Sequence, residues 1–84
     1  MIKVPVDVRE YSGYRADERP ASFHYLGTVY VITSVIGLVR ELTSDGRLVN
    51  RFDVQVGDDH FTLLHDETEG QWYLLVEKPL AKKV

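Results

Sequence analysis

The sequence predicts an all-β fold: a small, strongly bent antiparallel sheet or partly open barrel of five to six strands. Short stretches that alternate apolar and polar residues, or that are rich in β-branched and aromatic residues, are separated by turn-forming pairs. Three such stretches near the C-terminus, 51–56, 60–65 and 71–76, share one apolar face. A helical pattern occurs only in 32–42, where it competes with a strand pattern.

The first expected strand lies near the N-terminus, where Ile2, Val4, Val6 and Val8 alternate with other residues. Pro5 cannot donate a ladder hydrogen bond, so this strand is expected at an edge of the sheet. The polar stretch 11–21, which contains glycine and proline, is expected to be a loop.

A hairpin is expected next, with strands at 23–26 and 29–32. A two-residue loop at Gly27-Thr28 suits it because glycine tolerates positive φ. The expected cross-strand pairs are Tyr25 with Tyr30 and Phe23 with Ile32.

The segment 29–42 allows two interpretations. Ile32, Val35, Ile36 and Val39 have helical spacing, but the segment is rich in β-branched residues and contains Gly37. The favoured interpretation is one long strand, bent or bulged near Gly37, that leaves one side of the curved sheet and joins the other. A helix over 32–42 is the alternative, and 43–46 is expected to be a turn.

The three C-terminal stretches are expected to form a meander. Gly57-Asp58 suits a two-residue loop, and Asp66 to Glu69 forms a four-residue loop. The expected pairs are Val54 with Phe61, Phe52 with Leu63, Leu63 with Trp72, and Phe61 with Leu74. Both registers place the same apolar face inward, and a one-residue slip in either would lose it.

Composition bounds the function. The 84 residues predict one small domain over 1–79 and a frayed tail over 80–84. The net charge of −3 argues against a protein that wraps nucleic acid, and the absence of cysteine excludes disulfides and thiolate metal sites. The N-terminus lacks the apolar core of a signal peptide and no apolar stretch is long enough to span a bilayer, so a cytoplasmic protein is expected.

No catalytic, cofactor or metal site is predicted. His60 and His65 are five residues apart, so on one strand they point to opposite faces and cannot chelate one metal from regular strand geometry. A loop-borne site with nearby aspartates is the less favoured alternative. The nearby acidic residues are expected to be solvated at turns, and no serine has a partnered base in view. The acidic residues concerned are Asp58, Asp59, Asp66, Glu67 and Glu69.

Two binding surfaces are predicted as candidates. The first is the loop with Tyr11, Tyr14, Arg15 and Arg19, whose composition suits a recognition surface or stacking on single-stranded bases. The other interpretation folds this loop over the open end of the barrel, with Tyr11 plugging the core.

The second candidate surface is the meander's other face, where Leu64, Tyr73 and Leu75 make the face too apolar for an ordinary solvated one. Either the chain itself covers these residues, or they form a homodimer interface, or a different partner binds there.

One spacing resembles a known family. The residues are Arg19-Pro20, Phe23, Tyr25, Gly27, Tyr30, Ile32, Val35-Ile36, Arg40-Glu41 and Gly70-x-Trp72-Tyr73. Over residues 19–77 the chain resembles a family of short bacterial β-rich domains of unknown function, which read Arg-Pro, an aromatic residue, a glycine hairpin and a closing Gly-x-Trp-Tyr. Some members accompany error-prone DNA polymerases, so the resemblance implies a place near bacterial DNA repair. It supplies no catalytic residue.

The expected function is therefore a non-catalytic binding or accessory module, and the resemblance alone implies a role in bacterial DNA metabolism. Its partner is an unknown protein or a second copy, with weak nucleic-acid contact as a further option. The alternative is a self-associating structural domain whose homodimer interface is the Leu64, Tyr73 and Leu75 face.

Overall fold

The computed structural model describes residues 2–10 and 19–77, and all regular structure in these ranges is β-strand. The seven strands are β1 (Ile2–Glu10), β2 (Pro20–Tyr25), β3 (Thr28–Val31), β4 (Ser34–Leu42), β5 (Leu48–Val56), β6 (Asp59–Asp66) and β7 (Gln71–Val76). The expected tail 80–84 and most of the expected loop 11–21 lie outside the described residues.

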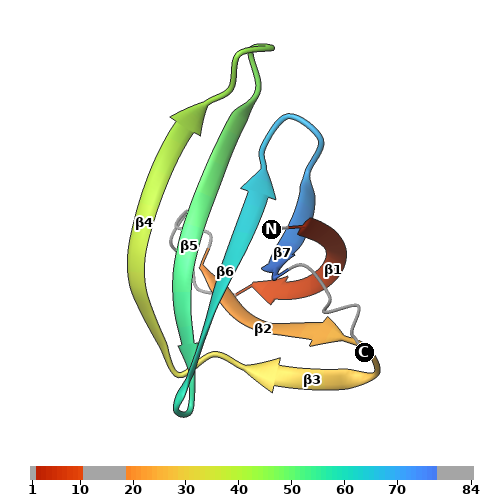
Figure 1. Cartoon of the computed structure of the whole chain (residues 1–84), viewed down its shortest axis with the longest axis vertical. Helices are drawn as coiled ribbons and strands as arrows, with labels where there is room; N and C mark the ends of the chain where they lie inside the picture. Colours follow the sequence, from red (N-terminus) through yellow and green to blue (C-terminus); the bar gives the residue numbers. More distant parts are fainter. Residues whose placement is uncertain (1, 11–18, 78–84) are drawn as a thin grey trace.

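The strands form one antiparallel sheet in the order β3-β2-β1-β7-β6-β5-β4. The sheet curls strongly into a half-barrel, and β2 and β3 run crosswise to the long strands β4 to β6, near the lower ends of those strands (Figure 1). The predicted all-β, bent-sheet class is confirmed, with seven strands rather than five to six.

The β5–β6 hairpin has the predicted register, with Phe52 opposite Leu63 and Val54 opposite Phe61. The predicted β6–β7 register is wrong by two residues, because Leu63 faces Leu74 and Trp72 faces His65. The four-residue loop is 67–70 rather than 66–69, since Asp66 pairs with Gln71 and Gly70 takes the positive φ of +72°. A shift of two keeps every side chain on its predicted face.

The β2–β3 hairpin is also shifted by two residues. Its loop is Leu26-Gly27, with φ of +50° and +77°, and Phe23 pairs with Tyr30 while Tyr25 pairs with Thr28. Positive φ at both loop positions is the pattern of a type I′ turn, whose twist matches that of the flanking strands. The predicted Gly27-Thr28 loop is wrong for that reason.

The ambiguous segment 29–42 is not helical. It forms β3 and β4, separated by residues 32–33, and a register irregularity between Val35 and Gly37 is the bulge expected near Gly37. At the corner, the Thr33 backbone N–H and hydroxyl both donate to the Gln55 carbonyl, at 2.8 and 2.9 Å. The chain therefore passes from one edge of the sheet to the other, as predicted, through two strands rather than one.

β1 is interior in the strand order, so the predicted edge position is wrong for the strand as a whole, although its first half pairs on one side only. It pairs with β7 through residues 2–6 and with β2 through residues 7–10. Pro5 lies in the first half, where β7 is the strand that the register places beside it. A proline is tolerated there because, among the described residues, no strand on its other side would need a hydrogen bond from its backbone nitrogen.

The core lies on the inner face of the curl. It contains Val6, Phe23, Phe52, Val54, Leu63, Trp72 and Leu74. Phe23 stacks on Tyr30 at 5.0 Å, and Phe61 meets both rings edge-on, so the crossing hairpin β2–β3 closes the foot of the core. The other buried core residues come from β1, β5, β6 and β7.

Candidate protein-interaction edge

The two ends of the sheet differ in length. β3 has four residues and β4 has nine. Within 2–10 and 19–77, β5 is the strand that pairs with β4, on one side. We call the other side of β4, over residues 36–42, the open edge. In Figure 1 it runs along the outside of the half-barrel.

The open edge is apolar. Ile36, Leu38, Val39 and Leu42 are 55%, 54%, 51% and 73% exposed. The pairing with β5 assigns their faces: Leu38 lies opposite the buried Phe52 on the inner face, and Val39 lies opposite the exposed Arg51 on the outer face. An exposed, long, apolar edge strand is a template for pairing with another chain.

On the inner face of β4, Arg40 connects the strand to the β6–β7 turn. Its guanidinium forms an ion pair with Glu67 Oε2 at 3.1 Å, and the amide of Asn50, which faces Arg40 across the strands, also donates to Glu67. The charge of Arg40 is thereby balanced within the chain.

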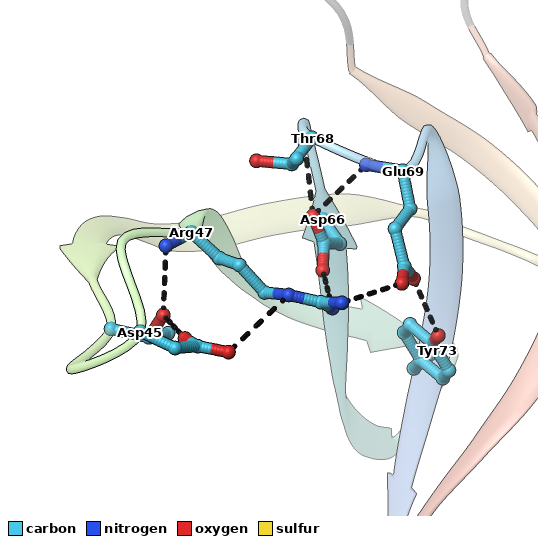
Figure 2. Close-up of polar contacts among 7 residues, drawn as sticks. Asp45, Arg47, Asp66, Thr68, Glu69 and Tyr73 are labelled. Carbon is cyan, nitrogen blue, oxygen red and sulfur yellow. Dashed lines mark hydrogen bonds and ion pairs between the residues drawn. The ribbon is translucent and has the colours of Figure 1, made fainter.

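A cluster of polar side chains lies just beyond the C-terminal end of β4. We call it the Arg47 cluster, and it consists of Asp45, Arg47, Asp66, Glu69 and Tyr73 (Figure 2). Arg47 donates to Asp66 and Glu69 at 2.8 Å each, and it pairs with Asp45 at 3.5 Å. The Tyr73 hydroxyl donates to Glu69 at 3.1 Å. These contacts join the β4–β5 turn to the β6–β7 turn.

Asp66 is 2% exposed, which corrects the expectation that it is a solvated turn residue. Burial alone raises the pKa of its carboxyl, but the backbone N–H groups of Glu69 and Thr68 and the Arg47 guanidinium outweigh burial and lower the pKa. The hydrogen bond and charge of Glu69 raise the pKa of Arg47. Desolvation and Glu69 raise the pKa of Tyr73.

The other acidic residues, Asp58, Asp59, Glu67 and Glu69, are exposed as expected, although Asp59 is the first residue of β6 rather than part of the turn. His60 faces Gln55 on the outer face and His65 is buried against Trp72, with ring centroids 4.3 Å apart, so the two histidines point to opposite faces as predicted. Among the described residues no group of three or more His, Cys, Asp or Glu could hold a metal ion.

The first predicted binding surface is described only in part. Tyr11, Tyr14 and Arg15 lie outside the described residues, and Arg19 is exposed just before β2. The recognition-loop hypothesis therefore stays a prediction.

The second predicted surface is brought together by the fold. Leu64 lies directly opposite Tyr73, and Leu75 follows two residues along β7 on the same outer face. All three side chains are half-buried. Lys3 lies 4.5 Å from the centre of the Tyr73 ring and covers part of this face.

Comparisons of the chain with protein-family models, curated proteins and solved structures find no match. In the described ranges no helix is long and apolar enough to cross a membrane. The open edge is the feature that sequence reasoning missed, because the order of strands in the sheet decides which strand is left at the end.

Proposed function

We propose that this chain is a non-catalytic protein-interaction module that binds an extended segment of a partner as an added strand along the open edge of β4. The observation that carries the proposal is a nine-residue edge strand with four large apolar side chains, each more than half exposed. In strand addition, backbone hydrogen bonds supply affinity and side-chain contacts supply specificity.

The two edges of the sheet are not equally suited to this role. Natural sheets blunt their edges with short strands, lysine, proline and bulges. β3 is short, with four residues. β4 contains neither lysine nor proline, and its bulge lies near its start, which leaves residues 38–42 regular. Binding is therefore expected at β4.

Fluorescence anisotropy with a labelled nine-residue peptide of alternating threonine and valine tests the proposal. A bound strand uses the hydrogen-bonding groups along one of its two sides. N-methylation of one set of alternate peptide residues should therefore abolish binding, and N-methylation of the other set should leave it intact. Equal effects of the two sets would contradict strand addition.

A pair of protein variants locates the binding. Val39→Lys places a charge on the open edge and removes an apolar contact worth about 1.5 kcal/mol, so binding should weaken about tenfold. Val29→Lys makes the same change on β3, where valine is 60% exposed, and should leave the affinity unchanged. The reverse pattern would place the site at the other edge.

Self-association through Leu64, Tyr73 and Leu75 is the second candidate, because the fold places these side chains side by side. Tyr73→Glu or Leu75→Glu should then convert a dimer into a folded monomer in sedimentation velocity experiments, since an unpaired charge is costly at an interface. A wild-type chain that is monomeric at all concentrations would exclude this candidate.

A link to bacterial DNA metabolism enters this proposal only through the resemblance of residues 19–77, and it indicates where partners could be sought. Strand addition at β4 does not depend on it.

A further inference from the structure

We infer that the strand bound at the open edge carries basic side chains on the outer face at two positions four residues apart, opposite Gly37 and Glu41, with non-basic residues between them. This inference rests on the proposed strand addition. It specifies the chemistry of the partner segment.

The first basic position follows from Gly37. Gly37 lies opposite Asp53, and a Cβ built on Gly37 would lie 3.6 Å from Asp53 Oδ2. The other oxygen, Oδ1, accepts a hydrogen bond from the Thr62 hydroxyl at 3.1 Å, which orients the carboxylate. Because Gly37 has no side chain, Oδ2 faces the open edge across bare backbone.

The hollow next to Asp53 suits a long basic side chain. It is an open hollow of about 450 Å³, lined by Asp53, by Leu75 and by Ile36, the residue before Gly37. Its ionisable lining groups are the carboxylates of Asp53 and Glu77 and the imidazole of His60. Lysine and arginine pack their methylene stems on apolar surface while the charged end reaches a polar group.

The distance also selects a long side chain. A residue opposite Gly37 on an added strand is separated from Asp53 by two strand spacings, about 10 Å in all. Asp53 leans toward Gly37, so a lysine or arginine on the added strand can span the remaining distance, whereas a short side chain cannot.

The second basic position follows from Glu41, which is exposed on the outer face opposite Val49. Between the two positions, Val39 lies opposite Arg51. A base opposite Val39 would approach the Arg51 guanidinium, so that position favours a non-basic residue. The outer-face pattern is therefore base, non-base, base at alternate residues, and it reads the same in both strand directions.

A second copy of this chain does not supply the pattern. Symmetric antiparallel pairing of β4 with β4 keeps each residue on its own face. The second copy would then contribute Gly37, Val39 and Glu41 to the outer face, while Arg40 stays on the inner face with Glu67. Centring the pair on Val39 would place Glu41 of one copy opposite Gly37 of the other, beside Asp53. The charges favour a different protein as the partner.

The test compares two extended peptides with the cores Lys-Thr-Val-Leu-Lys and Gln-Thr-Val-Leu-Gln, each flanked by threonines, in anisotropy titrations at low salt. Each exposed ion pair should strengthen binding about two- to fivefold, so the lysine peptide should bind more tightly and lose this advantage at high salt. Asp53→Asn keeps an acceptor for the Thr62 hydroxyl. It should remove the part of the lysine peptide's gain in affinity that comes from the lysine opposite Gly37.

Two further variants sharpen the result. Gly37→Ala places a methyl group at ordinary contact distance from Asp53 Oδ2, so it should fold and weaken only the lysine peptide. Asp58→Asn removes an exposed carboxylate in the β5–β6 turn and should change nothing. Melting curves confirm that each variant is folded.

The outcomes separate the inference from the function on which it rests. If both peptides bind equally, or if Asp53→Asn leaves the lysine advantage intact, the charge pattern is wrong while strand addition stands. If neither peptide binds, the proposed function fails. If sedimentation shows a wild-type dimer that must dissociate before the peptide binds, a second copy occupies the edge and the inference is overturned.

Discussion

At the scale of the residue, Asp66 shows how a turn carboxylate becomes structural. Its Oδ1 accepts from the backbone N–H groups of Thr68 and Glu69, and its Oδ2 accepts from Arg47. Sequence reasoning placed Asp66 at a solvated turn because it lies in the loop expected between two strands, and the acidic stretch around it contains no lysine or arginine. Its cationic partner is Arg47, nineteen residues away in sequence, and the fold brings it there. A local pattern cannot contain that information.

The pH dependence of stability tests this role. Because the pKa of Asp66 is lower in the folded protein than in the unfolded chain, its contribution is complete above the ordinary carboxyl pKa of about 3.9. The contribution is lost as the pH falls through the lower, folded pKa. We expect the free energy of unfolding, measured with urea, to decrease from about pH 5 downward.

The variant Asp66→Asn should be less stable than wild type at neutral pH and should depend less steeply on pH below 5. A shallow slope remains, because the hydrogen bond from Thr43 also lowers the pKa of Asp45. Asp58→Asn is the control and should keep the wild-type slope. If the free energy of unfolding of Asp66→Asn changed with pH in parallel with that of wild type, the Asp66 carboxylate would not be the source of the pH dependence.

Trp72 is the second residue with a specific expectation. It is 5% exposed, packs on Phe52 and His65 at 5.4 and 4.3 Å, and donates from Nε1 to Glu10 at 3.1 Å. Trp72→Ala should cost about 3–5 kcal/mol, a large part of the stability of a small domain. Urea unfolding measures it, and Trp72→Phe, which keeps a ring, should cost less. A Trp72→Ala chain with the wild-type urea midpoint would contradict the core assignment.

At the level of the strands, the apolar pattern predicts which face of the sheet a side chain lies on, but it does not predict which residues are paired across two strands. The hairpins β2–β3 and β6–β7 each differ from expectation by two residues, which leaves every face as predicted. The loop decides between registers that differ by two. In β2–β3, Leu26 occupies a positive-φ position that sequence preference assigns to glycine or asparagine, so the sequence pointed to the neighbouring loop.

In the Leu26-Gly27 turn, we expect two substitutions to change the stability of the protein in opposite directions. Leu26 has φ of +50° and is 82% exposed, so it is strained and makes little packing contact. Leu26→Asn should stabilise the chain by about 1 kcal/mol, because asparagine tolerates this conformation. Gly27→Val should destabilise it by at least about 1–2 kcal/mol. Thermal unfolding measures both changes, and equal melting temperatures for the two variants would refute the turn.

At the scale of the whole molecule, the curl of the sheet creates the candidate site. β3 and β4 are consecutive in the chain yet occupy opposite ends of the strand order, and they diverge from the corner at 32–33. The sequence indicated that this segment changes sides of the sheet. It did not indicate that β4 would remain at an edge, since Pro5 pointed to β1 instead. Strand order depends on long-range pairing, which period-two patterns do not encode.

Backbone amide hydrogen exchange over residues 34–42, with and without the lysine peptide, shows directly whether the open edge of β4 binds an added strand. In the free, dilute protein, alternate amides of β4 that point away from β5 should exchange fast, and the intervening amides should be protected. Peptide binding should protect the fast set and leave exchange in β3 unchanged. If the fast set is already protected in the free chain, or if the peptide protects a different strand, the open edge of β4 is not the binding site.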